Sequence, residues 1–258
     1  MILFHRKRII IMPSENSIYM ISYYRNWHGR CVMTEVDVFP CSSPDWFKNS
    51  EKISIVISQL CKSYKVQHCY ITIILGGDKL LLKRIQIPSK KHAAALSAME
   101  WDEIVNDNER KIFDVAYSGT ATDGINHYWM AAVYPYDLIM AFCIAFRQEE
   151  NIVDRIDTMP SLLSRFYSDL SGTLYCQAEA GTHICVYDRG ILNAYRWHDG
   201  IPGEFLQWIE DNGEQDMLYR PLVRIKEQWN LPYIQKDCQK KISDYHLQYP
   251  TAFFLPLL

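Results

Sequence analysis

Three short runs near the start of the chain place apolar residues at the two-residue period of β-strands. They span Arg8 to Met12, Ser17 to Arg25 and Arg30 to Phe39, and the turn-forming stretch Asn26 to Gly29 separates the last two. Strands that are joined by tight turns pair in an antiparallel fashion. The opening of the chain therefore predicts a three-stranded antiparallel ladder.

The apolar period then changes to that of a helix. Ser43 followed by Pro44 is typical of a helix start, with serine as the N-cap and proline at the first helical position. An apolar stripe at helical spacing follows and predicts one buried face. Its members are Ile53, Val56, Ile57, Leu60, Cys61 and Tyr64. The β-branched run from Cys69 to Leu75 then favours a central strand of a sheet.

The middle of the chain predicts an inserted group of strands around one helix. A turn at Gly76 to Lys79 leads into a strand from Leu80 to Ile87, and Ser89 is the expected N-cap of the helix that follows. Strands are expected at Ile112 to Tyr117 and His127 to Tyr134, separated by a turn-rich stretch. The helix positions expected to be buried are Ala94, Ala98, Trp101, Ile104 and Val105.

Two further helices are expected to begin at Pro135 and Pro160, with a short strand from Ile152 to Ile156 between them. Each helix carries an apolar stripe that predicts a buried face. The inward positions are Leu138, Ile139, Phe142 and Phe146 in the first helix, and Leu162, Leu163, Phe166, Tyr167 and Leu170 in the second.

After Gly172 the opening pattern returns, with short strands at Thr173 to Gln177, Thr182 to Asp188 and Ile191 to Trp197. A repeated ladder followed by a helix indicates two related α/β halves. We predict a first half at residues 1–170, with an insert at about 78–130 beside it, and a second, shortened half at residues 171–258. In each half, parallel strands are expected to extend the ladder. A helix at residues 205–211 and a last strand at residues 251–258 complete the prediction.

Composition narrows the functional classes. Hydrophobic residues make up 48% of the 258 positions and the net charge is −3, so the chain can bury a core and has no basic excess. A dedicated nucleic-acid binder needs clustered lysine and arginine to displace counterions from phosphates. We therefore expect no nucleic-acid partner. No apolar run approaches the ~20 residues that a spanning helix needs, so no direct membrane insertion is expected.

The polar motifs do not form an enzyme or metal site. The eight cysteines include no C-x-x-C pair, and the histidines show no H-E-x-x-H spacing, so we expect reduced cysteines and no metal site. The stretch Gly76 to Lys79 suggests a phosphate loop, but a strand and not a helix follows it, which favours a hairpin turn. Asp78, Glu100 and Asp114 have no spacing that makes any two of them a catalytic pair.

Several local sequences resemble one family. The start RIIIMPSENSIYMISYY and the central stretch KRIQIPSKKHAAALSAMEWDEIVND, with its acidic Glu100, are similar to type IV pilus assembly proteins of the PilM kind and to the related GspL cytoplasmic domain. FDVAY, WMAAVYPYDLIMAF, NIVDRIDTMPSLLSRFY and THICVYDRGILNAYRW, with Arg196, follow in the same order. The resemblance implies an actin-like (ribonuclease H-like) duplicated α/β fold with a small inserted subdomain.

The nucleotide site that the resemblance implies is degenerate. Such a site needs glycines where backbone N–H groups approach phosphates, and a carboxylate for the metal. The first phosphate turn is here Met12-Pro13-Ser14, in which Pro13 has no N–H and Ser14 adds a side chain. The second turn, Glu179 to Thr182, keeps Gly181 and Thr182 as a residual nucleotide or anion site, although a strand turn explains Gly181 equally well. No glycine follows Gly213, so the glycine-rich adenosine loop is missing. We expect no catalytic residue and no cofactor, ATP and magnesium included.

The resemblance also implies a partner. It suggests a cytoplasmic scaffold, peripheral to the inner membrane, that captures the cytoplasmic tail of a single-pass membrane protein of the PilN kind. We place the docking surface between the first half and the insert, with Lys83 and Arg84 in the wall, although both also suit a solvated strand. The alternative is an ATP-binding actin-like ATPase whose nucleotide state controls partner binding. A sugar-kinase-like enzyme would need glycines and aspartates that the sequence lacks.

Overall fold

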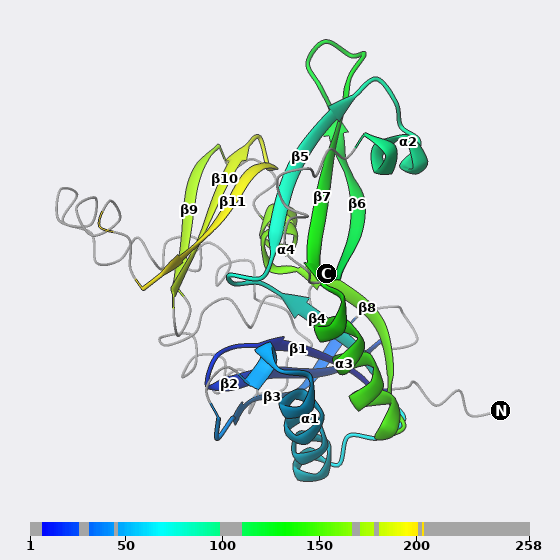
Figure 1. Cartoon of the computed structure of the whole chain (residues 1–258), viewed down its shortest axis with the longest axis vertical. Coiled ribbons are helices and arrows are strands. Elements are labelled where there is room, and N and C mark those ends of the chain that lie inside the picture. Colours follow the sequence, from blue (N-terminus) through cyan, green and yellow to red (C-terminus); the bar gives the residue numbers. More distant parts are fainter. Residues whose placement is uncertain are drawn as a thin grey trace.

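The first ladder forms as the alternation predicts. The computed structural model describes residues 7–25, 31–43, 46–98, 110–166, 171–177, 181–200 and 203. In it, strands β1 (Arg8–Pro13), β2 (Ser17–Arg25) and β3 (Cys31–Pro40) pair in antiparallel fashion. Strands β4 (Tyr70–Leu75) and β8 (Ile152–Thr158) extend this ladder in parallel, in the order β3-β2-β1-β4-β8 (Figure 1). The parallel extension expected for the first half is confirmed.

Two helices cover one face of this five-stranded sheet. Helix α1 (Ser50–Tyr64) buries most of its predicted stripe, and helix α3 (Tyr136–Gln148) buries all four predicted inward residues. Their side chains share one core with Ile9, Ile71 and Ile73 of the sheet. This packing is the expected result of two amphipathic helices lying against an apolar sheet face.

The start of α1 differs from the prediction. A short 3₁₀ helix (Trp46–Lys48) follows the Ser43–Pro44 pair, and the N-cap of α1 is Asn49. The Asn49 side-chain oxygen accepts hydrogen bonds from the backbone N–H groups of Glu51 and Lys52 at 3.0 and 3.1 Å. The short helix buries Trp46 completely, and this burial moves the start of α1 along the chain.

The other face of the sheet packs against the second half. Helix α4 (Met159–Phe166) and the strands β9 (Gly172–Gln177), β10 (Gly181–Asp188) and β11 (Ile191–Asp199) lie on this side. The three strands form the antiparallel ladder that the repeat predicts. One hydrophobic cluster joins the two ladders. It includes Ile10, Tyr19, Ile21, Leu162, Leu174, Cys185, Tyr187 and Leu192.

The insert forms its own antiparallel sheet from β5 (Leu81–Ile87), β7 (His127–Pro135) and β6 (Lys111–Thr120). Helix α2 (His92–Ser97) covers one face through Ala95. Its N-cap is Lys91, not the predicted Ser89, whose hydroxyl instead accepts a hydrogen bond from the Lys91 N–H. The sequence places this insert beside the first half, but β5 also joins β11, at Lys83 and Ala194. The insert and the second ladder therefore form one six-stranded sheet, β6-β7-β5-β11-β10-β9.

Some predictions fall on residues outside the described ranges. These are Glu100, Trp101, Ile104 and Val105, Tyr167 and Leu170, and everything predicted for residues 204–258, including strands that would extend the second ladder in parallel. The division of the chain at residues 170 and 171 stays a prediction. None of the helices in the described part of the chain has the length and apolarity needed to cross a membrane.

Candidate functional site

The turn between β1 and β2, which corresponds to the first phosphate turn, is closed by the protein's own groups. The Ser14 N–H donates to the Ser17 carbonyl at 2.8 Å, and the Trp46 indole N–H donates to the Ser14 carbonyl at 2.9 Å. The Lys48 ammonium lies 3.9 Å from a Glu15 oxygen and 3.5 Å from an Asp78 oxygen. The Glu15 and Asp78 carboxylates therefore face a lysine of the same chain.

In the second turn, the two residues that the structure describes, Gly181 and Thr182, make contacts within the protein. Thr182 is fully buried, and its hydroxyl donates to the Gly200 carbonyl at 2.8 Å. A Cβ atom at Gly181 would lie 2.4 Å from the His198 carbonyl oxygen and 2.4 Å from the Trp197 ring, so close strand packing requires glycine here. Anion binding by Gly181 and Thr182 stays a prediction. In the described ranges, no group of three or more histidine, cysteine, aspartate or glutamate side chains is placed to hold a metal.

A half-buried polar junction ties the turn between β4 and β5 to the second ladder. The Tyr195 hydroxyl accepts from the Gly77 N–H at 2.9 Å and donates to the Gly77 carbonyl at 3.1 Å. The same oxygen lies 3.0 Å from Nδ1 of His183. A Cβ atom at Gly76 would lie 2.7 Å from the His183 ring. Burial lowers the pKa of His183 to about 3 and raises the pKa of Tyr195, so both are neutral near pH 7.

The structure does not bring Lys83 and Arg84 into a docking surface next to the first half. The Arg84 guanidinium hydrogen-bonds to the Asn193 side chain of β11 and stacks over the Tyr128 ring at 4.6 Å. Lys83 is exposed and pairs with Ala194 across the strands. Both residues therefore lie at the seam between β5 and β11. A role for them in partner binding stays a prediction.

A candidate site is an apolar groove between the edge strands of the two sheets, which we call the β6–β8 groove. Its cavity is about 570 Å³, within the range of ligand sites. Helix α3 contributes Ile139 and Cys143, and β4 with its following turn contributes Leu75 and Leu80. The remaining walls come from β6, β7 and β8 with the start of α4. They are Ile112, Phe113, Asp114, Val115, Ala116, Met130, Ala132, Val133, Tyr134, Val153, Asp154, Arg155, Ile156, Asp157, Thr158 and Ser161.

The strands on either side of the groove are both at sheet edges. β8 ends the five-stranded order and β6 ends the six-stranded order, so each strand has one side without a strand neighbour in the described part of the chain. Edge strands present backbone N–H and C=O groups to which another strand can pair. On the cavity face, Ile112, Asp114 and Ala116 of β6 lie opposite Tyr134, Ala132 and Met130 of β7.

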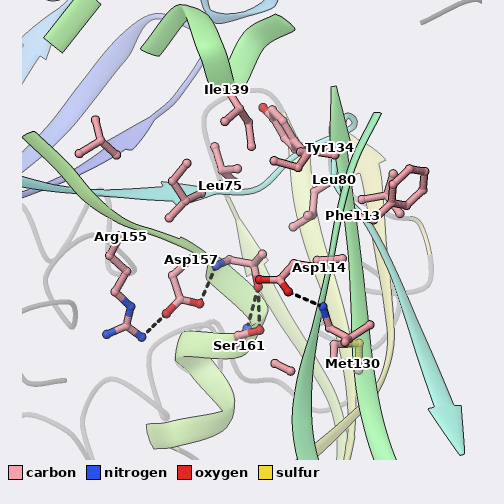
Figure 2. Close-up of a pocket in the computed structure, with 18 of the residues that line it drawn as sticks. Leu75, Leu80, Phe113, Asp114, Met130, Tyr134, Ile139, Arg155, Asp157 and Ser161 are labelled. Atoms are coloured by element: carbon pink, nitrogen blue, oxygen red, sulfur yellow. Dashed lines mark hydrogen bonds and ion pairs between the residues drawn. The ribbon is translucent and has the colours of Figure 1, made fainter. Parts of the chain in front are cut away.

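Polar groups gather at one part of this mainly apolar cavity (Figure 2). Asp157 is paired with Arg155 and also accepts a hydrogen bond from the Thr158 N–H at 2.8 Å. The Thr158 hydroxyl donates to the Ser161 hydroxyl at 2.7 Å, at the first turn of α4. Asp114, on the opposite wall, lies 3.3 Å from His92 of α2. These side chains have partners of their own, and the apolar surface between them is open.

Sequence reasoning placed a docking surface between the first half and the insert, but it assigned none of the residues of the β6–β8 groove to that surface. Small side chains such as Ala116 and Ala132 make the hollow, and alanine in a strand carries no signal of a cavity. The sequence did hold one indication. Three charged residues, Asp154, Arg155 and Asp157, lie in a run whose other members are mostly apolar. That charge pattern is typical of a strand at a sheet edge.

No protein-family model and no curated protein sequence matches the chain. Several solved structures match the chain. The PilM–PilN type IV pilus biogenesis complex matches with a TM-score of 0.59 and 11% identity, over 93% of this chain and 78% of the other. The cytoplasmic domain of EpsL, an inner-membrane component of the type II secretion system of Vibrio cholerae, matches with a TM-score of 0.49 and 15% identity, over 81% and 76%. A Bacteroides thetaiotaomicron protein described as having an actin-like ATPase fold matches with a TM-score of 0.46 and 12% identity, over 94% and 99%.

The strand order agrees with this likeness. An antiparallel three-stranded ladder continued by parallel strands, repeated as a second ladder after α4, is the arrangement that the sequence resemblance predicts. The low identities limit the comparison to the fold. The chain therefore has an actin-like α/β fold, shared with the protein of the PilM–PilN complex.

Proposed function

We propose that this chain is a non-catalytic scaffold of a type IV pilus or type II secretion-like machine. In this proposal it binds the cytoplasmic tail of a single-pass inner-membrane protein and is held at the cytoplasmic side of the membrane by that partner. The observation that carries the proposal is the β6–β8 groove, an apolar cavity between two sheet edges. The matched solved structure, a complex of PilM with PilN, supports the choice of machine.

An extended peptide suits this groove for two physical reasons. Its backbone can pair with an edge strand, which supplies affinity, while pockets for alternate side chains supply specificity. Strand β8 has seven residues, and a strand rises about 3.3 Å per residue, so the edge accommodates a tail segment of about seven residues. The exposed apolar side chain of Ile156 at the groove would lose contact with water in the complex.

Co-expression tests this function. The chain is expressed with the cytoplasmic tail of each single-pass membrane protein encoded next to it, and capture of the tail is measured by pull-down. We expect the wild type to retain one tail. Ala132→Trp fills the cavity from the centre of β7 and is expected to reduce capture at least about tenfold.

Ala194→Trp is the matched control, because Ala194 is an exposed strand alanine on β11 outside the groove. This variant should capture the tail as the wild type does. Circular dichroism and thermal unfolding of both variants confirm that each one folds. If the wild type retains none of the tails, the scaffold function loses its support. Lys83→Glu/Arg84→Glu, compared in the same assay, tests the placement that the sequence suggested.

A further inference from the structure

Three strands at the ends of the two sheets share one local contact. In β3, β6 and β8, an aspartate carboxylate accepts a hydrogen bond from the backbone N–H of the next residue. The pairs are Asp37 with Val38 at 2.9 Å, Asp114 with Val115 at 2.8 Å, and Asp157 with Thr158 at 2.8 Å. The last two pairs lie on opposite walls of the β6–β8 groove (Figure 2). A carboxylate that occupies an edge N–H competes with the carbonyl of an incoming strand, and charged side chains protect sheet edges against such pairing.

The Val115 N–H is directed toward the outer side of β6, where the described part of the chain has no strand. The Tyr136 N–H donates to the Arg110 carbonyl at 2.8 Å and continues the β6–β7 ladder. Backbone groups alternate between the two sides of an antiparallel strand. Asp114, an even number of residues from Arg110, therefore directs its backbone groups to β7, and Val115 directs its own outward. The hydrogen bond from the Val115 N–H to the Asp114 carboxylate agrees with this direction.

The β8 edge is protected by more than its aspartate. The register against β4 shifts between Val153 and Arg155, so Asp154 is an extra residue that forms a β-bulge. Asp154 is ion-paired with Arg8. Arg155 is paired with Asp157 along the strand. Bulges and charged side chains both keep an edge strand from pairing with another chain, so β8 is the less suitable of the two edges.

The β6 edge is regular and has apolar side chains on both faces. Its register against β7 is unbroken from Lys111 to Tyr117. Ile112 and Ala116 line the groove on one face, and Phe113 and Tyr117 are exposed on the other. A strand that pairs with β6 would place its side chains alternately beside these two faces. Apolar residues of the tail would therefore be shielded from water on either face.

We propose that the tail adds to the six-stranded sheet as a strand beside β6, and that Asp114 blocks this edge until the tail binds. In the free chain the Asp114 carboxylate occupies the Val115 N–H. In the complex a tail carbonyl takes its place, and the carboxylate keeps its contact with His92, whose Nε2 lies 3.3 Å from the same oxygen. This inference rests on the proposed function, because it names the edge to which the tail pairs and the residue that controls access to it.

The amide hydrogens of Val115 and Thr158 are a matched pair for a test, because each is bonded to the preceding aspartate at 2.8 Å. A random dodecapeptide library is selected on the wild-type chain, and peptides that also bind Ala132→Trp are removed. Hydrogen exchange of the two amides is then measured by NMR with and without one of the remaining, groove-dependent peptides. We expect the peptide to slow exchange at Val115 at least about tenfold and to change exchange at Thr158 by less than about twofold.

Two variants test the blocking role of Asp114. Asp114→Ala and Asp157→Ala each remove one carboxylate from the groove, and fluorescence anisotropy measures their affinity for the same peptide. We expect Asp114→Ala to bind about three- to tenfold more tightly than the wild type, because one competing hydrogen bond is gone, and Asp157→Ala to bind as the wild type does. Asp114→Asn keeps a neutral acceptor for the Val115 N–H and should lie between the wild type and Asp114→Ala. Circular dichroism confirms that each variant folds.

The outcomes separate this inference from the proposed function. Slowed exchange at Thr158 in place of Val115, or tighter binding by Asp157→Ala alone, overturns the assignment to β6. A groove-dependent peptide that protects neither amide overturns strand addition. Protection of Val115 without tighter binding by Asp114→Ala, or equal gains in Asp114→Asn and Asp114→Ala, overturns the blocking hydrogen bond. These results leave the proposed function standing. Absence of any groove-dependent peptide overturns the proposed function, and this inference with it.

Discussion

At the residue scale, a few buried polar side chains hold the parts of the molecule together. The Tyr195 hydroxyl hydrogen-bonds to both the N–H and the carbonyl of Gly77, and it contacts Nδ1 of His183. A hydroxyl has one proton and two lone pairs, so the Tyr195 oxygen can take part in all three contacts. Asn151 acts in a similar way at the start of β8. Its amide bonds to the Cys69 N–H and to the carbonyls of Val66 and Glu149.

Removing the Tyr195 hydroxyl tests the junction. Tyr195→Phe leaves the half-buried Gly77 N–H without its partner and removes one of the two hydrogen bonds to the Gly77 carbonyl, which also accepts from the Leu80 N–H at 3.3 Å. We expect a cost of about 1–3 kcal/mol of unfolding free energy. The measurement is urea unfolding followed by circular dichroism. Tyr117→Phe is the control, because the exposed Tyr117 hydroxyl bonds to Thr120 at the surface and its loss should cost less than about 0.5 kcal/mol. Equal losses in the two variants would contradict the role of Tyr195.

Burial of His183 predicts a dependence of stability on pH. The pKa of His183 is about 3 in the folded chain and about 6.5 in the unfolded chain. Between these values only the unfolded chain binds the proton, so stability falls as pH decreases from about 6.5 and is constant, for this group, above about 7. The slope contributed by one such group is about 1.4 kcal/mol per pH unit.

Urea unfolding at pH 7, 5.5 and 4.5 measures this slope for the wild type and for His183→Gln. Glutamine can keep a hydrogen bond to Tyr195 but does not titrate. The other ionisable groups are the same in both proteins, so the difference between the two slopes belongs to His183. Parallel pH profiles for the two proteins would show that His183 does not carry this effect.

At the scale of elements, periodicity predicted the strands and helices well, while helix starts depended on tertiary contacts. The stripes of α1 and α3 follow from their sequences. The N-cap of α1 did not, because both Ser43 and Asn49 are good caps and only the burial of Trp46 decides between them. Likewise, Ser89 precedes α2 but accepts a hydrogen bond from Lys91 before the helix begins.

The choice of cap gives a matched pair of variants. Asn49→Ala removes the acceptor for the Glu51 and Lys52 N–H groups and is expected to cost about 1 kcal/mol of unfolding free energy. Ser43→Ala removes a hydroxyl that accepts a hydrogen bond from the Lys52 ammonium at 3.0 Å at an exposed site, and it should change stability by less than about 0.5 kcal/mol. Thermal and urea unfolding measure both. A larger loss for Ser43→Ala would place the functional cap where the sequence alone suggested it.

At the scale of the whole molecule, two ladders share a core and the insert bridges them. The cluster that joins Ile10 and Tyr19 to Leu174 and Leu192 packs the ladders directly against each other. The turns where a nucleotide would approach in this fold are engaged by internal groups, the Lys48 ammonium at one and the Gly200 carbonyl at the other. These contacts support the proposal that the chain is not an ATPase.

A nucleotide titration separates the scaffold from the ATPase alternative. Because Pro13 offers no N–H and the Thr182 hydroxyl donates within the protein, we expect isothermal calorimetry with ATP and magnesium to show no binding in the micromolar range. Lys48→Ala removes the ammonium beside Glu15 and Asp78. The same titration of this variant tests the site a second time. A clear micromolar signal from the wild type would favour the ATP-binding alternative.

The sequence by itself determined the elements and the fold. The two-residue and helical periods predicted the strands and helices, and the repeated ladder with its family resemblance predicted the actin-like arrangement, because local periodicity records which face of each element is buried. The β6–β8 groove was decided only by the tertiary structure. Leu75, Ala132 and Ile156 are far apart along the chain, and nothing local to any of them records which sheet edge it will face. The same holds for Arg84, whose sequence neighbours suggest an open groove wall but whose partner, Asn193, arrives from the second ladder.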